Sequence, residues 1–412
     1  RNVLRDRAPE VLTDLLSAGA AEIDFTRHPP PELHPLAPEP GDEDLVALAC
    51  RRTTFEWVLR RRALATPGIS IVPGAVEGLV AEQGPSGVPQ VVGVGLAGGT
   101  AVRADLVVDA AGRRSPLPRW LAAAGAGPVP DTEEGTGIIY SSRFYRAGPS
   151  EEDPSTQPLV VGDLGYVKYA VFPGDNRTLS ITFGVHADDA EMRRLLQPGP
   201  FGALASAFPA TRRWAESPDC QPISGVEVMG DLVNRRRRLV VGGRPLATGI
   251  FAVGDSSVCT NPLYGRGCAL ALVHAELLGD TLAAQGNGLD LDGAALAFAE
   301  VTRAEIEPWY GAALAQDRSD RASDGGEEED LDGPVGVGSL MRHGLVPAAR
   351  TDPLVYRAFI RTWNLLDRPD AMMRDPQVVM RVMAAWQRRA ERPTVPRPGP
   401  DRSELLARLT AA

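Results

Sequence analysis

The sequence has 412 residues but only four cysteines and one lysine. The cysteines, Cys50, Cys220, Cys259 and Cys268, are far apart and form no Cys-x-x-Cys pair. This spacing supports neither a disulfide framework nor a zinc site, so we expect no bound metal and a reducing, cytoplasmic location. Apart from Lys168, arginine supplies the positive charge.

Long apolar runs and an excess of positive charge are also absent. No stretch approaches the 18 or so consecutive apolar residues that a membrane-spanning helix needs, so we expect no membrane span. Lysine and arginine number 43 against 53 acidic residues, which gives a net charge of −10. Phosphate backbones repel such a chain, and we expect no nucleic-acid partner. Hydrophobic residues make up 43% and charged residues 23%, which excludes wholesale disorder.

The N-terminal third alternates between helical and strand patterns. Apolar residues recur at helical spacing over residues 9–17 and 53–64. Short apolar runs at 69–72, 75–81 and 88–96 are separated by glycine-rich turns, which predicts a small antiparallel meander.

The rest of the chain contains one buried-strand pattern and several alternating ones. Residues 106–109 form a near-continuous apolar run that ends in Asp109, which predicts a strand buried on both faces. Residues 138–145, 159–172 and 178–185 alternate, which predicts a second antiparallel sheet. Helices are expected over 268–282, over 291–315 and in the C-terminal region.

Residues 250–278 carry the most informative pattern. A buried strand leads into Gly254 and Asp255, and a loop then brings Pro262, Gly265 and Gly267 to the start of a long apolar helix. Glycines at a helix start let backbone N–H groups approach an anionic ligand, and an aspartate at a strand end can accept hydrogen bonds from sugar hydroxyls. The same pattern also suits a plain strand–loop–helix with glycine caps, and spacing alone does not separate the two.

Two other features that could mark a binding site are better explained by structural roles. Four consecutive arginines, 235–238, precede an expected strand, and a solvated turn is more usual there than a binding patch. His274 lies within the apolar helix, where a hydrogen-bonded core histidine is the more usual outcome. No Ser/His/Asp set or G-x-S-x-G elbow is present, so hydrolase chemistry is unsupported.

The 252–267 region closely resembles the Gly-Asp motif of FAD-dependent aromatic hydroxylases and related epoxidases. In that family the aspartate and the following P-x-x-G-x-G bind the ribityl chain, pyrophosphate and flavin edge. The resemblance thus implies that Gly254, Asp255, Pro262, Gly265 and Gly267 bind FAD. The family usually has glutamine where this chain has Arg266.

Two further segments resemble the same family. Residues 105–115 are similar to a D-x-V-V-x-A-x-G-x-x-S segment, which implies FAD contacts at Asp109, Ala110 and Gly112. Residues 50–60 are similar to a helix start with a flavin-contacting arginine, here Arg52, although a solvated helix start is the alternative. The resemblance also implies a cofactor contact at Val76.

The family's N-terminal dinucleotide fingerprint is missing. A strand, G-x-G-x-x-G and a helix would open the fold, about 40 to 50 residues before Arg1. Gly93, Gly95 and Gly98 have this spacing but open no helix. We therefore expect the chain to be an N-terminally truncated fragment of such a flavoprotein.

The implied fold is α/β, with an incomplete three-layer FAD-binding domain, an antiparallel substrate domain and C-terminal helices. Residues 1–137 and 223–283 would form the FAD-binding domain, residues 138–222 the substrate domain and residues 284–412 the helical region. An apolar pocket could be lined by six aromatic residues of the second sheet, although more than half of them are expected to be plain core or sheet face. They are Tyr140, Phe144, Tyr166, Tyr169, Phe172 and Phe183.

The resemblance implies an NAD(P)H-dependent monooxygenase. In that family NAD(P)H reduces FAD, and O₂ then supplies one oxygen atom to an apolar or aromatic small molecule. The cofactor carries the difficult chemistry, so we name no catalytic side chain. A flavin-dependent reductase without oxygen activation and a non-catalytic remnant remain the alternatives.

Overall fold

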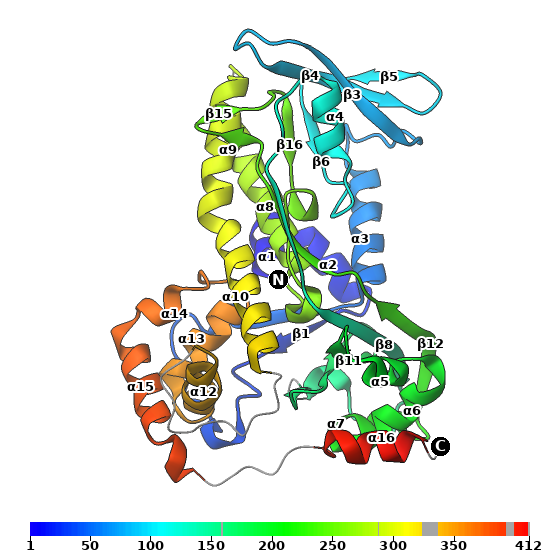
Figure 1. Ribbon diagram of the computed structural model, residues 1–412, viewed down its shortest axis with the longest axis vertical. Helices are drawn as coiled ribbons and strands as arrows, with labels where there is room; N and C mark the ends of the chain where they lie inside the picture. The colour runs from blue at the N-terminus through cyan, green and yellow to red at the C-terminus, as the bar shows by residue number, and fades with distance from the viewer. Residues whose placement is uncertain (158–159, 287, 324–336, 393–398, 411–412) are drawn as a thin grey trace. The chain divides into compact units, whose positions relative to one another are not determined.

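The computed structural model describes residues 1–157, 160–286, 288–323, 337–392 and 399–410 (Figure 1). These residues form two compact units, each assembled from separate stretches of the chain. The first unit comprises Arg1–Ile69, Gly137–Leu232 and Asp317–Ala412, and the second comprises Ser70–Thr136 and Val233–Gln316. The sequence analysis divides the chain by expected role, into an FAD-binding domain, a substrate domain and a helical region. The two compact units do not test these roles, so this division stays a prediction.

The first unit contains a five-stranded antiparallel sheet in the order β12-β8-β11-β10-β9. Its strands are β8 (Ile138–Ala147), β9 (Val160–Asp163), β10 (Lys168–Pro173), β11 (Thr178–His186) and β12 (Cys220–Met229). The predicted second antiparallel sheet is therefore confirmed. Residues 160–172 nevertheless form two strands rather than one, because Gly165 adopts a left-handed φ of +84° in the turn between them. Leu159, the first residue of the predicted strand, lies outside the described residues.

Three helices pack against one face of this sheet. They are α5 (Ala190–Leu195), α6 (Pro198–Ala207) and α7 (Pro209–Ala215). The fully buried ring of Phe183 contacts Phe201 and Phe208, with ring centroids 5.6 and 5.8 Å apart. Tyr169 packs on Phe208 at 5.1 Å. Phe183 and Tyr169 are therefore core residues of the first unit.

Lys168 joins this sheet to the end of helix α10 (Glu307–Ser323). Its ammonium group pairs with Asp163 and lies 3.2 Å from a carboxylate oxygen of Asp320. Only 14% of the side chain is exposed. Burial acts to lower the pKa of Lys168, but the two carboxylates outweigh burial and raise it.

The remaining elements of the first unit are mainly helical. The N-terminal part has α1 (Asn2–Arg7), α2 (Pro9–Ser17), the antiparallel pair of β1 (Ala21–Asp24) and β2 (Val46–Ala49), and α3 (Arg52–Ala65). The C-terminal part has α12 (Val346–Thr351), α13 (Pro353–Trp363), α14 (Ala371–Arg374), α15 (Pro376–Gln387) and α16 (Arg402–Thr410). The helices predicted over 9–17, over 53–64 and near the C-terminus are thus confirmed.

The second unit contains the predicted meander, but its strands differ. They are β3 (Val76–Gln83), β4 (Pro89–Leu96) and β5 (Ala101–Arg103). The strand predicted at 69–72 is wrong, because this segment is in no strand. Pro67 and Pro73 flank it, and proline lacks the N–H that a sheet ladder needs. Gly98 and Gly99, both at positive φ, instead turn the chain back to form β5.

A parallel pair of strands organises the rest of the second unit. Strand β6 (Val107–Asp109) pairs with β16 (Ile250–Ala252), with Val107 opposite Ile250. Val108 is 46% exposed, so the prediction of a strand buried on both faces is wrong. Within the described residues this sheet has only two strands, so one side of β6 has no strand against it.

Helices and a second small sheet complete the second unit. The helices are α4 (Leu117–Ala123), α8 (Gly267–Ala283), α9 (Leu291–Glu305) and the first part of α10, and the sheet has the order β17-β13-β7 (Val258–Cys259, Val233–Arg237 and Asp131–Gly135). Helix α8 confirms the helix predicted over 268–282. The helix predicted over 291–315 is instead divided at Ile306 into α9 and α10, and Pro308 lies in the first turn of α10, where proline is favoured. Among the described residues, none of the helices has the length and apolarity that crossing a membrane requires.

Candidate functional site

Two strand ends meet at one edge of the β6–β16 pair. Because the strands are parallel, their carboxyl ends lie at the same edge, where α/β sheets bind ligands. Asp109 lies opposite Ala252, and the Val253 N–H donates to the Asp109 carbonyl oxygen at 3.0 Å. The turns that begin at Ala110 and Gly254 therefore start side by side. The structure thus brings together two motifs that are about 145 positions apart in the sequence.

Asp109 holds its own turn together. Its carboxylate accepts hydrogen bonds from the Ala111 N–H at 2.9 Å and from the Ser115 hydroxyl at 2.5 Å. The Ser115 oxygen in turn accepts from the Leu117 N–H, at the start of α4. Asp109 is buried, whereas Ala110 is exposed and the space beside Gly112, at φ +80°, is open. A ligand would therefore meet the backbone of this turn rather than the Asp109 carboxylate.

Gly254 is required at its position for two reasons. Its φ is +58°, in the left-handed region, and a Cβ here would lie 3.2 Å from the Cβ of Ala271 on α8. The Gly254 N–H donates to Nδ1 of His274 at 3.1 Å. His274, predicted as a core residue, is fully buried.

Asp255 belongs to the short 3₁₀ turn η4 (Gly254–Ser256) that follows Gly254. The Asp255 carboxylate lies near the thiol of Cys259. Burial raises the pKa of this thiol to about 12, and the negative charge of Asp255 adds to the rise. The buried Ser256 hydroxyl donates to the Asp109 carbonyl oxygen at 2.6 Å. The turn that carries Asp255 is therefore fixed against the Asp109 turn.

The N-terminus of α8 is open. Pro262 begins the 3₁₀ turn η5 (Pro262–Tyr264), and Gly265 then turns the chain at φ +64° into α8, which starts at Gly267. Among the described residues, and apart from the adjoining ones in the chain, no atom lies within 4 Å of where a Cβ of Gly265 or Gly267 would be. Arg266 makes no side-chain capping hydrogen bond, and its guanidinium lies over the Trp309 ring, 4.7 Å from the centroid. The positive end of this 17-residue helix can therefore be approached by an anion.

The arginines 235–238 are not a solvated turn, so that interpretation is wrong. Residues 235–237 belong to β13, where Arg235 and Arg237 contact the two turns and the acidic strand β7. Arg236 pairs instead with Glu307 of α10 at 3.2 Å. Arg235 donates to the Arg113 carbonyl oxygen at 2.6 Å. Arg237, only 6% exposed, donates to Asp131 at 3.0 Å and to the Ser256 carbonyl oxygen at 3.2 Å. The sequence carried no signal for this strand, because four consecutive arginines show no alternation of polar and apolar residues.

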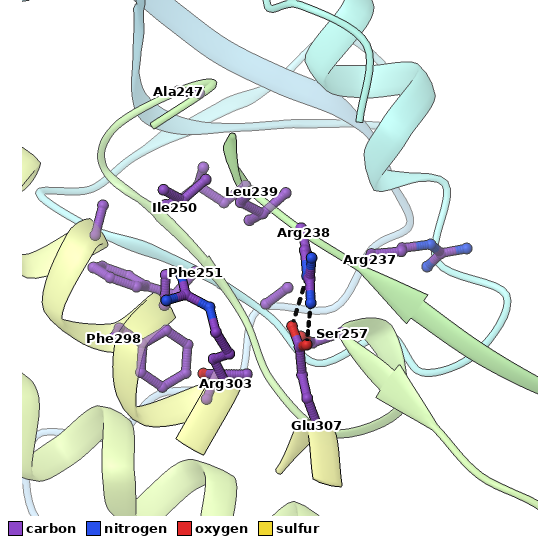
Figure 2. Close-up of a pocket in the computed structure, with 15 residues that line it drawn as sticks. Arg237, Arg238, Leu239, Ala247, Ile250, Phe251, Ser257, Phe298, Arg303 and Glu307 are labelled. Atoms are coloured by element: carbon purple, nitrogen blue, oxygen red, sulfur yellow. Dashed lines mark hydrogen bonds and ion pairs between the residues drawn. The ribbon is translucent and has the colours of Figure 1, made fainter. Parts of the chain in front are cut away.

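A cavity of about 60 Å³ lies beside β16 in the second unit (Figure 2). Phe251 and Phe298 form part of its apolar wall, and Arg238 donates to Glu307 at 2.8 Å along the other side. This volume has room for only a few water molecules and is well below that of a cofactor pocket. This cavity is therefore too small to hold a dinucleotide cofactor.

Arg52 belongs to the first unit, and Val76 begins β3 in the second. Arg52 is 78% exposed and donates to Glu56 at 2.6 Å. Its neighbour Arg51 pairs with the fully buried Asp175 at 2.7 Å, and Arg51 also lines a cavity of about 490 Å³ beside α3. Val76 is 38% exposed. The cofactor contacts of Arg52 and Val76, like those of the other site residues, stay predictions.

Comparison with known proteins identifies the fold. No protein-family model matches the sequence. Protein Rv3254 of Mycobacterium tuberculosis is 29% identical over 351 residues, which cover 79% of this chain and 68% of that protein. A triple mutant of the flavin-dependent brominase Bmp2 has a TM-score of 0.59 at 16% identity, with 95% of this chain and 88% of that chain covered.

A second solved structure is similar. PqsL of Pseudomonas aeruginosa, "a probable FAD-dependent monooxygenase", has a TM-score of 0.53 at 15% identity, with 78% of this chain and 85% of that chain covered. The chain therefore has the fold of these flavin-dependent enzymes. The predicted α/β class, with antiparallel sheets and C-terminal helices, is confirmed.

Proposed function

We propose that the chain is an FAD-dependent monooxygenase that binds its cofactor at the two turns and at the start of α8. The open, glycine-lined start of α8 beside the Gly254–Asp255 turn carries the proposal. An elongated, doubly anionic dinucleotide with a polyhydroxylated chain matches a positive helix end next to a carboxylate.

Each part of this site has its own task in binding. The N–H groups at the start of α8 would face the pyrophosphate, and the missing side chains of Gly265 and Gly267 let the backbone approach it. The Asp255 carboxylate would accept hydrogen bonds from the ribityl hydroxyls. Ala110 and Gly112 would contact the cofactor through the backbone, because the Asp109 carboxylate is occupied within its turn.

The reaction that we propose uses NAD(P)H, O₂ and an apolar or aromatic small molecule. NAD(P)H would supply two electrons, one atom of O₂ would enter the substrate, and the other would leave as water after uptake of a proton. FAD would supply the electron transfer and the oxygen activation. The protein binds and orients both molecules and keeps water away from the reacting atoms.

For the substrate we propose the sheet face of the first unit that is opposite α5–α7. Register pairs Phe144 with Ser180 and Ser180 with Phe172, so these three side chains share that face. Phe144 and Phe172 are only partly buried, whereas Tyr169 and Phe183 belong to the core on the other face. Two rings separated by a small residue suit a flat apolar ligand. PqsL has been crystallised with 2-aminobenzoylacetate, a small aromatic molecule.

A cofactor titration tests the proposal first. The purified chain is titrated with FAD, and binding is followed by flavin fluorescence and by the visible spectrum. We expect saturable binding, which Asp255→Ala weakens on the order of tenfold or more, because a charged hydrogen-bond acceptor is lost. Glu77→Ala removes an exposed carboxylate of the same unit and should bind like the wild type. Absence of FAD binding by the wild type would overturn the proposal in favour of a non-catalytic protein.

Oxygen isotopes then separate a monooxygenase from a reductase. With NAD(P)H, ¹⁸O₂ and a panel of small aromatic and alkene substrates, we expect one ¹⁸O atom in the product for each NAD(P)H consumed. A reduced product without ¹⁸O would instead assign the flavin-dependent reductase activity.

A further inference from the structure

His274 is the buried side chain in contact with the Gly254 turn. It lies on α8, one helical turn after Ala271, whose Cβ approaches Gly254. Its ring stacks on Phe298 with centroids 4.9 Å apart and planes at 17°. Both ring nitrogens have partners, Nδ1 with the Gly254 N–H at 3.1 Å and Nε2 with the Thr302 hydroxyl at 3.0 Å.

These partners fix the protonation state of the ring. A backbone N–H can only donate, so Nδ1 must carry a lone pair and His274 must be neutral. The proton is then on Nε2, which donates to Thr302 Oγ1. Burial lowers the pKa of His274 to about 4, which agrees with a neutral ring at neutral pH.

The hydrogen bond to His274 Nδ1 holds Gly254, the residue that precedes Asp255 in the turn. Gly254 has a left-handed φ, and its N–H direction defines how the chain leaves β16. On the far side of the same turn, Ser256 is held by the Asp109 carbonyl oxygen and by Arg237. The turn is therefore held at both ends, and Asp255 lies between them.

We propose that His274 is a positioning residue of the flavin site, whose Nδ1 holds the Gly254 N–H and so directs the Asp255 carboxylate toward the cofactor. This inference rests on the proposed function. His274 touches no cofactor or reacting atom in this assignment, and it acts through Gly254.

Three substitutions separate positioning from simple packing. In His274→Asn the side-chain oxygen can take the place of Nδ1 and accept the Gly254 N–H. In His274→Gln the amide extends toward the place of Nε2 and Thr302. In His274→Phe the ring and its stack on Phe298 remain, but both nitrogens are lost. Only the Asn variant keeps an acceptor for Gly254.

The test measures FAD affinity and amide hydrogen exchange on the same proteins. We expect His274→Asn to bind FAD within about threefold of the wild type, and His274→Gln and His274→Phe to bind about tenfold more weakly. In the FAD-free proteins, exchange of the peptide that contains Gly254 should accelerate in the Gln and Phe variants but not in the Asn variant. Equal FAD affinity in all four proteins, or equal loss in all three variants, would overturn the inference.

The two proposals fail differently. If the wild type binds no FAD, the proposed function is wrong, and exchange at Gly254 still decides whether His274 holds this turn. If the wild type binds FAD and Asp255→Ala does not, but the Asn and Phe variants behave alike, the proposed function stands and the role of His274 is wrong.

Discussion

At the scale of single residues, the site depends on groups that are buried and already bonded. The Asp109 carboxylate and His274 Nδ1 accept hydrogen bonds from backbone N–H groups, and the Ser256 hydroxyl donates to the Asp109 carbonyl oxygen, so these three residues fix the two turns. The sequence motifs pointed to Gly254 and Asp255. They did not show that Asp109 is used internally, because a hydrogen bond to Ser115 depends on the path of the turn rather than on residue type.

His274 should make the protein sensitive to mild acid. Its pKa is about 4 in the folded chain and about 6.5 when unfolded, so the unfolded state binds the extra proton between these values. Stability should therefore fall as pH drops from 6.5 toward 4, by about 2 kcal/mol between pH 7 and pH 5. Urea unfolding at both values checks this, with His274→Asn as the variant that lacks the titration. An equal pH effect in both proteins would refute the assignment.

Two glycines at similar φ should respond differently to alanine. Gly254→Ala meets both left-handed strain and the Ala271 Cβ at 3.2 Å, whereas Gly265→Ala meets the strain alone. We expect a loss of about 3 kcal/mol for the first and about 1 kcal/mol for the second, measured by urea unfolding. A smaller loss for Gly254→Ala than for Gly265→Ala would contradict this account.

At the scale of elements, the errors of the sequence interpretation have local causes. Prolines on both sides keep residues 69–72 out of the meander, and the long predicted helix divides at Ile306, just before Pro308 in the first turn of α10. The four arginines suggested a solvated turn because charge usually follows exposure. Strand β13 is different, since β7 places Asp131 and Glu133 beside it.

The stability of the second unit should depend on Arg237, the buried arginine of strand β13. Arg237→Ala leaves Asp131 with one arginine fewer and removes a donor to the Ser256 carbonyl oxygen, so we expect a loss of about 3 kcal/mol in the free energy of unfolding. Arg244→Ala, an exposed arginine of the same unit, should change it by less than about 0.5 kcal/mol. Chemical denaturation compares the two variants. Equal losses of stability would contradict the view that the contacts of Arg237 stabilise the protein.

The start of α8 should show opposite effects on stability and binding. Gly267→Asp replaces glycine in the first helical turn and adds a negative charge at the positive helix end, so the free protein should gain about 1 kcal/mol. The same charge would repel the cofactor pyrophosphate and weaken FAD binding on the order of tenfold. Unfolding and FAD titration of one protein measure both, with Gly279→Ala inside α8 as the control. Unchanged FAD binding would exclude this helix end from the site.

At the scale of the whole molecule, two sequence motifs that are far apart in the chain lie together in the structure. The 105–115 and 252–267 segments meet at one sheet edge, as parallel strands require. The chain passes from one compact unit to the other after residues 69, 136, 232 and 316. Such boundaries depend on contacts between distant segments, which residue patterns do not contain.

Binding of FAD should slow hydrogen exchange in only a few segments of the chain. Hydrogen exchange of the whole chain, with and without FAD, should show protection at residues 109–115, 253–257 and 265–270 of the second unit. Helices α5–α7, which pack on the core face of the five-stranded sheet, should not change. Protection over α5–α7 without protection at the two turns would move the cofactor elsewhere.

The single lysine has a practical consequence. Apart from the chain terminus, Lys168 carries the only amine of the protein, and its two carboxylate partners shield it. An acylating reagent would attack it only when the contact with Asp163 and Asp320 opens, since a protonated, paired amine is a poor nucleophile. The rate of acylation of Lys168, followed by mass spectrometry of a single peptide, would thus report how often this contact opens. No label would have to be introduced by mutation.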